Sequence, residues 1–98
     1  MKSEIFNKKY DEVFVACKKA LQNLEMTIEI EDKLNKTITC SVQTSFLSWG
    51  ENVQINFEMV NQFSTRIEVE SNSQAQLISW GKNEENEEKI ISQMRQIL

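Results

Sequence analysis

Histidine and proline are absent from this chain of 98 residues, and glycine occurs only twice, as Gly50 and Gly81. Without an imidazole, the chain lacks the commonest general base, which excludes Ser-His and Cys-His nucleophile pairs. Two isolated glycines cannot form the phosphate-binding patterns GxGxxG or GxxxxGK[S/T]. Without proline, the turns depend on asparagine, serine and these two glycines. The sequence therefore predicts a protein that is not an enzyme and holds no cofactor.

Cysteine is also scarce. Cys17 and Cys40 are too far apart for a CxxC pair, and each falls on the apolar face of a predicted element. We predict that both are small core residues; a redox pair across a helix–sheet interface is the alternative. Two thiols without an imidazole do not make a zinc site. The glutamates of Glu84–Glu88 complement a helix dipole, so we expect no metal there either.

The chain has no apolar run near the roughly 18 residues that a membrane span needs, and its start, MKSEIFNKKYDEV, has no apolar signal region. The net charge is −4, and the 11 basic residues are scattered along the chain. Nucleic acids and anionic membranes both require a concentrated positive surface. We therefore expect no nucleic acid and no membrane as partner, and a cytoplasmic protein.

Two stretches have the spacing of amphipathic helices. Apolar residues from Tyr10 to Leu24 recur at i, i+3, i+4 and i+7, which predicts a helix over residues 8–24 with Asn7 as its N-cap. The same spacing returns near the end of the chain, where Asn83 is the expected cap of a second helix.

Between these helices the period changes to two, which is typical of half-buried strands. The alternating apolar residues are Met26, Ile28, Ile30, Ile38, Cys40, Val42, Val53, Ile55, Phe57, Met59, Ile67 and Val69. Residues 3–7, SEIFN, fit either a short strand or an extended arm. The sequence predicts a single α+β domain over residues 1–98, in which a four- to five-stranded antiparallel meander carries both helices on one face.

A short motif occurs twice, as FLSWGENV at Phe46–Val53 and as LISWGKNE at Leu77–Glu84. A strand is predicted after the first copy and a helix after the second, which favours two similar joints over a duplication. If the motifs line one end of the domain, they form a candidate site for an apolar or planar ligand or for a partner. That site would consist of Phe46, Leu47, Trp49, Leu77, Ile78 and Trp80. The alternative is that both tryptophan rings only cover the edges of the core.

The element order, together with YDEVFVACKKAL in the first helix, SWGENVQI entering the third strand of the meander and WGKNEENEEKI leading into the last helix, resembles a family of small bacterial domains without an assigned activity. Those domains are similar to the helix-grip or TATA-binding-protein-like fold, in which a curved antiparallel sheet wraps around a C-terminal helix. Here the predicted solvent face carries Glu29, Glu58, Glu68 and Glu70 with one Arg66, which would repel phosphate.

Two classes of function remain after these exclusions. The first is a non-catalytic interaction or accessory module that binds another protein or its own copy, by a sheet edge or by the tryptophan segments. The alternative is a carrier that holds a small apolar ligand between the curved sheet and the C-terminal helix.

Overall fold

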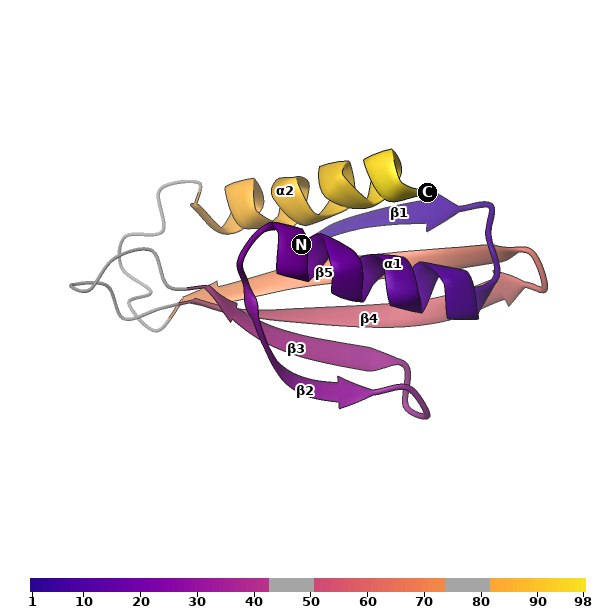
Figure 1. Ribbon diagram of the computed structural model, residues 1–98, viewed down its shortest axis with the longest axis horizontal. Helices are drawn as coiled ribbons and strands as arrows, with labels where there is room; N and C mark the ends of the chain where they lie inside the picture. The colour runs from indigo at the N-terminus through magenta and orange to yellow at the C-terminus, as the bar shows by residue number, and fades with distance from the viewer. Residues whose placement is uncertain (43–50, 74–81) are drawn as a thin grey trace.

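The computed structural model describes residues 1–42, 51–73 and 82–98. The element order is strand, helix, four strands and helix (Figure 1). The bounds are β1 Lys2–Phe6, α1 Tyr10–Asn23, β2 Thr27–Asp32, β3 Thr37–Val42, β4 Glu51–Asn61, β5 Ser64–Ser73 and α2 Lys82–Ile97. The predicted α+β class is confirmed.

All five strands form one antiparallel sheet in the order β1-β5-β4-β3-β2. Strands β2 to β5 are a meander, as predicted, and the SEIFN stretch is a strand rather than an arm. It pairs with β5 from Lys2 opposite Val69 to Phe6 opposite Thr65. Strands β4 and β5 are the longest, and their pairing joins the two halves of the sheet.

Both helices cover the same face of this sheet (Figure 1). The alternating residues of the three central strands point toward them, and Ile55 and Ile67 are fully buried there. From the other side, Val13 and Cys17 of α1 and Ile90 of α2 close the core. Burying one such aliphatic side chain contributes roughly 1.5–3 kcal/mol. The spacing of two in the strands and of 3.6 in the helices places these side chains on facing surfaces, and their burial stabilises the two layers.

The predicted helix caps are wrong. Helix α1 begins at Tyr10 after Lys9, which occupies the N-cap position without a side-chain cap bond. Asn7 instead lies in the β1–α1 connection, where its Oδ1 accepts a hydrogen bond from the Ser64 hydroxyl at 3.2 Å. Helix α2 includes Asn83, because it begins one residue earlier, at Lys82. Asn7 is therefore used to hold the connection against β5.

The expectation for Ile30 is also wrong, because β2 contains a bulge. Ile28 lies opposite Cys40, but the register then shifts and Ile30 lies opposite Thr39, on the other face of the sheet. Ile30 is consequently 58% exposed. An extra residue in one strand reverses the side-chain alternation beyond it, so a period of two in sequence does not guarantee one face.

Helix α1 ends in a Schellman motif without glycine. Glu25 has a φ of +59°, the Glu25 N–H donates to the Gln22 carbonyl at 3.0 Å, and the Met26 N–H donates to the Leu21 carbonyl at 2.9 Å. Met26 and Leu21 are both buried, which is the apolar contact that accompanies this motif. Glu25 therefore occupies a left-handed position that glycine adopts at lower cost.

We predict that Glu25→Gly stabilises the protein by about 1 kcal/mol, because it removes the steric cost of a Cβ atom in the left-handed region. Urea unfolding followed by circular dichroism measures the change. The matched control is Glu25→Ala, which also removes the carboxylate but keeps the Cβ atom. Equal stability of the Gly and Ala variants would contradict the prediction.

A group of ion pairs joins α2 to the edge strand β1. The Arg95 guanidinium donates two hydrogen bonds to the Glu4 carboxylate, with Nε 2.6 Å from Oε2. Arg95 Nη1 also lies 3.6 Å from Glu88 Oε1, and Lys2 Nζ lies 3.6 Å from Glu88 Oε2. The hydrogen bonds from Arg95 hold the pKa of Glu4 below its ordinary value.

We predict that Arg95→Gln raises the pKa of Glu4 and destabilises the fold at neutral pH. Because the folded-state pKa of Glu4 is depressed, its contribution is present above the unfolded-state pKa and is lost as the pH falls through the folded-state value. An NMR titration of the Glu4 side-chain carboxyl in both proteins measures the shift. Lys89→Gln breaks the exposed Lys89–Glu85 pair, at 3.2 Å, and is the control that should leave Glu4 unchanged.

Candidate functional site

The aromatic site predicted from the repeated motif lies outside the described residues. Its members Phe46, Leu47, Trp49, Leu77, Ile78 and Trp80 all fall within residues 43–50 and 74–81. The described strand ends show where these two segments are attached. Val42 pairs with Glu51, and Glu51 pairs with Ser73, so β3, β4 and β5 meet the segments at one end of the sheet.

A buried carboxylate lies near this end of the sheet. The Glu87 side chain is 2% exposed, and its Oε2 accepts a hydrogen bond from the Ser71 N–H at 2.9 Å. Its Oε1 lies 3.3 Å from the amino group of Met1. Burying a carboxylate is costly unless it is paired and hydrogen-bonded, so these two contacts hold β1 and β5 against α2.

Sequence reasoning missed the burial of Glu87, because it treated Glu84–Glu88 only as a group of charges that complements the helix dipole. The signal was present in the helical spacing. Glu87 precedes Ile91 by four residues and Met94 by seven, which places it on the buried stripe of α2. Among the described residues, no group of three or more thiol and carboxylate side chains is placed to hold a metal ion.

The two cysteines are free thiols inside the core. Cys17 of α1 and Cys40 of β3 both have no exposed surface. Burial raises the pKa of Cys17, with a smaller contribution from Cys40, and burial raises the pKa of Cys40 to about 12, with a smaller contribution from Glu29. Because the thiolate is the reactive form, this environment favours packing over redox chemistry.

We predict that neither cysteine reacts with a thiol-specific aromatic disulfide reagent in the native protein at mildly alkaline pH, whereas both react in denaturant. Absorbance of the released thiolate measures the reaction. Leu34→Cys provides the control, since Leu34 in the β2–β3 turn is 88% exposed and the new thiol should react at once. Rapid modification of native Cys17 or Cys40 would show that the core opens to the reagent.

The opposite end of the sheet is formed by the β4–β5 hairpin. Asn61 pairs with Ser64 across the turn, and its Oδ1 accepts a hydrogen bond from the Phe63 N–H at 2.8 Å. An asparagine side chain thus closes a turn in which the chain has neither glycine nor proline. The register shifts between Met59 and Asn61, a bulge that changes the direction of the strand before the turn.

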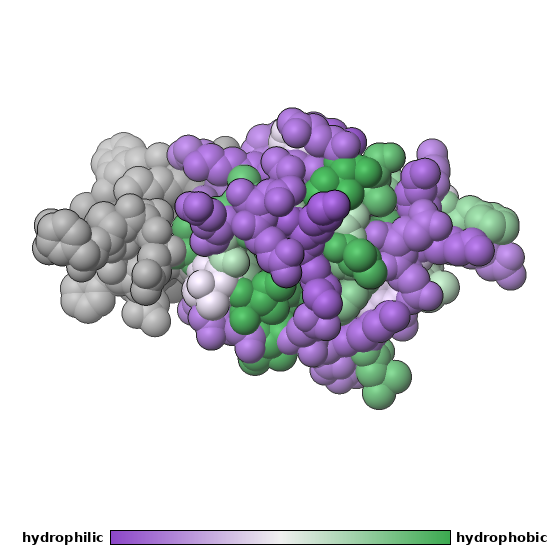
Figure 2. Space-filling model, viewed as in Figure 1, coloured by the Kyte–Doolittle hydropathy of each residue, from purple (hydrophilic) through white to green (hydrophobic). Residues whose placement is uncertain are grey.

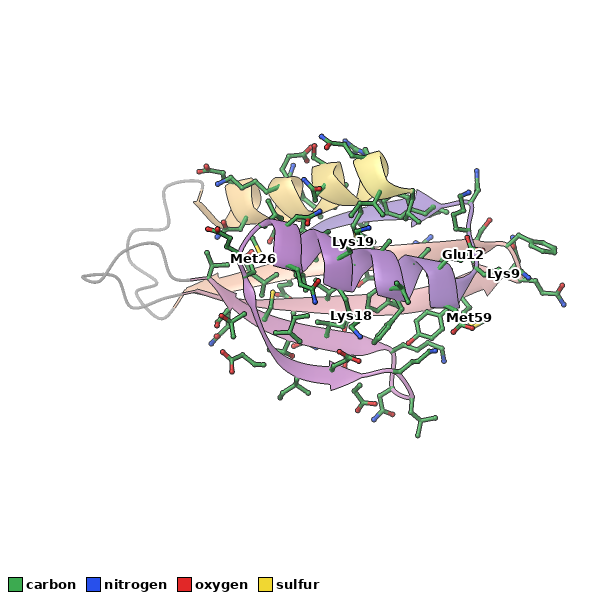
Figure 3. The ribbon with its side chains drawn as sticks, in the orientation of Figure 1. Lys9, Glu12, Lys18, Lys19, Met26 and Met59 are labelled. Atoms are coloured by element: carbon green, nitrogen blue, oxygen red, sulfur yellow. The ribbon has the colours of Figure 1, made fainter. Side chains whose placement is uncertain are left out.

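This hairpin leaves apolar side chains in solvent. Phe63 is 62% exposed and Met59 is 50% exposed, and Val60 between Met59 and the turn is exposed as well. An open hollow of about 490 Å³ lies beside them, which we call the hairpin-end patch. Its lining residues are Lys9, Tyr10, Asp11, Met59, Gln62 and Phe63. Figure 3 shows Lys9 and Met59 together where the start of α1 meets the hairpin.

The patch rests on a rigid support. The Tyr10 ring packs against Phe14 and Phe57 with centroid distances of 5.6 and 5.8 Å, and its hydroxyl donates to the Lys33 carbonyl at 2.7 Å. Thr65 of β5 donates its hydroxyl hydrogen to the Lys8 carbonyl at 3.0 Å. The start of α1, the β2–β3 turn and the hairpin are therefore fixed relative to one another.

Sequence reasoning missed this patch because it gave no role to the phenylalanine of NQFS, residues 61–64, which connects two of the predicted strands. An aromatic residue in a two-residue turn cannot reach the core. Its presence there was the sequence signal for an exposed ring. Phe63 instead lies under Lys9, whose Nζ is 5.8 Å from the ring centroid. This distance is within the range of a cation–π contact.

A second apolar hollow, of about 500 Å³, lies between α1 and the end of α2. We call it the helix groove. Val15 and Ala16 of α1 form its floor together with Ile97 and Leu98 at the end of the chain. Its rim is formed by Asp11, Glu12 and Lys19. Figure 2 shows apolar surface on α1 and at the C-terminal end of α2.

No protein-family model matches this chain, and no curated protein matches it significantly. Within the described ranges, neither helix combines the length and apolar character that crossing a membrane requires. The functional argument therefore depends on the surfaces themselves.

Proposed function

We propose that this domain is a non-catalytic protein-interaction module that binds its partner at the hairpin-end patch. The observation that carries the proposal is the exposure of Phe63 and Met59 on a support fixed by Tyr10. Exposed aromatic and methionine side chains are enriched in protein interfaces, where they contribute large contact areas. Holding them in place before binding reduces the entropy that binding costs.

The charges around the patch indicate the chemistry of the partner. Lys8 and Lys9 are exposed at its edge, and Lys36 lies with its Nζ 5.9 Å from the Tyr10 ring centroid. Lys33 of the β2–β3 turn is paired with Asp11, a lining residue of the patch, with its Nζ 3.2 Å from Oδ1. The other three lysines therefore supply the net positive charge. An apolar surface bordered by lysines is complementary to a protein segment that carries apolar side chains next to carboxylates.

The other exposed face of the sheet fits an interaction role less well. Its described residues are mostly polar and acidic, with Glu58, Glu68 and Glu70 and one Arg66. Ile5 and Ile30 are exposed at its opposite edges, and none of its described residues is aromatic. The edge strands are also poor templates for an added strand. Strand β2 is bulged and acidic, and β1 is short and charged, both of which oppose edge pairing.

The carrier alternative has less support. Its ligand would lie between the sheet and α2, where Ile90, Ile91 and Met94 are at most 1% exposed and pack into the core. The hollows near α1 and the hairpin open to solvent instead. The resemblance to the helix-grip fold therefore stays a prediction and carries no ligand to this chain.

The test is site-specific photo-crosslinking in the native cells. Gln62 is replaced by a photoreactive benzophenone amino acid, and we expect a covalent adduct with another protein whose crosslinked peptide contains apolar and acidic residues. Phe63→Ser in the same chain should remove the adduct, because it removes the largest exposed apolar side chain. As Phe63 is mostly exposed, the free energy of unfolding should change by no more than about 0.5 kcal/mol.

Two controls make the result specific. Ile30→Ser removes an equally exposed apolar side chain from the open face of the sheet and should leave the adduct at residue 62 unchanged. A benzophenone at Gln54, also on that face, should give no adduct. The proposal fails if residue 62 forms no adduct, or if its adduct persists in the Phe63→Ser protein.

A further inference from the structure

The helix groove has a charge pattern that is complementary to itself. Glu12 and Lys19 are seven residues apart in α1, which is about 700° of rotation and places them on the same face two turns apart. Val15 and Ala16 lie midway between them. Figure 3 shows Glu12 and Lys19 along the edge of α1 that borders α2, and Lys18 on the opposite edge.

No counter-charge for these two side chains lies in the part of the domain that the structure describes. Among the described residues, Glu12 and Lys19 take part in no ion pair, although their neighbours on the helix do. Asp11 Oδ1 lies 3.2 Å from Lys33 Nζ. Lys18 Nζ lies 3.1 Å from Glu31 Oε2. The acid and the base that flank the apolar floor therefore lack an ion-pair partner among the described residues, whereas the other two charged residues of α1 have one.

We propose that the helix groove is the contact between two copies of this chain, related by a two-fold axis that passes between Val15 and Ala16. In such a dimer the two α1 helices are antiparallel. Each residue then faces the residue equally far beyond the axis, so Glu12 meets Lys19 of the second copy and Lys19 meets Glu12. A two-fold contact requires a surface that is complementary to itself, and this helix face has that property.

The apolar part of the groove completes the contact. Val15 is 61% exposed in the single chain, and the small side chain of Ala16 beside it allows another helix to approach closely. Ile97 and Leu98 extend the apolar floor beyond α1, so each copy covers the end of the other. Burial of Val15 at the centre would exclude water from between the two Glu12–Lys19 pairs.

A different protein would fit this groove less specifically. A partner chosen for its charge would complement one end of the groove, either the acidic end near Asp11 and Glu12 or the basic end at Lys19. The opposite charges lie at equal distances from the apolar centre, which suits a copy rotated by half a turn. The helix groove shares only Asp11 with the hairpin-end patch, so the dimer and the proposed binding function are separate hypotheses.

The test uses charge reversal and measures the dissociation constant of the dimer by sedimentation velocity of the full chain. Glu12→Lys and Lys19→Glu should each weaken self-association by about tenfold or more, because each turns both ion pairs into repulsions. An equimolar mixture of the two variants should recover association, because every 12–19 contact between them is again attractive. The variant that carries both substitutions should also recover it.

Two further variants separate this contact from general effects. Glu68→Lys makes the same charge change on the open face of the sheet and should associate as the unchanged chain does. Val15→Ser removes the apolar centre, leaves both charges in place and should weaken association. Circular dichroism and thermal unfolding establish whether each variant is folded. If a charge-reversal variant is unfolded, Val15→Ser provides the test instead.

The proposal is overturned if the unchanged chain stays monomeric up to millimolar concentration, or if the mixed variants associate no better than either alone. It is also overturned if Glu68→Lys weakens association as much as Glu12→Lys does. In any of these cases the crosslink at residue 62 and its loss in Phe63→Ser are unaffected, so the two proposals can fail independently.

Discussion

The burial of one face of the sheet beneath both helices is the constraint on which the rest of the structure depends. Strands β4 and β5 provide the centre of this face, and Ile55 and Ile67 on them have no exposed surface. A sheet with one apolar face is stable only when another layer covers it, and α1 and α2 each present one apolar stripe. Because both apolar stripes pack against the sheet, the outward sides of the helices and the ends of the hairpins are the surfaces that can contact other molecules.

Polar groups inside this core connect elements that hydrophobic contacts alone would leave free to slide. Glu87 accepts the Ser71 N–H, and the buried Thr65 hydroxyl donates to the Lys8 carbonyl, so each fixes one end of β5. A hydrogen bond requires a defined distance and direction, whereas apolar contacts tolerate displacement. Thr65 is two residues from Phe63, so its bond to Lys8 holds the hairpin end of β5 against the start of α1.

The exposed surface divides into regions of different character. The described residues of the open face of the sheet are mostly polar and acidic, with Ile5 and Ile30 exposed at opposite edges. The hairpin-end patch combines Phe63 and Met59 with lysines, and the helix groove combines Val15 with one acid and one base. Charge complementarity distinguishes the two: a lysine border is complementary to an acidic partner, whereas a balanced pair of charges about an apolar centre is complementary to itself.

The sequence by itself determined the fold class and most of the core, because periods of 2 and 3.6 report which side chains share a face whatever the neighbours are. It did not determine where those periods are interrupted. The bulge that turns Ile30 outward and the cap at Lys9 depend on pairing with β3 and on the path of the β1–α1 connection, which are tertiary properties. The described surfaces were likewise decided by tertiary structure. The hairpin-end patch joins residues near position 10 with residues near position 60, and the helix groove joins α1 with the end of the chain, so no local pattern contains either one.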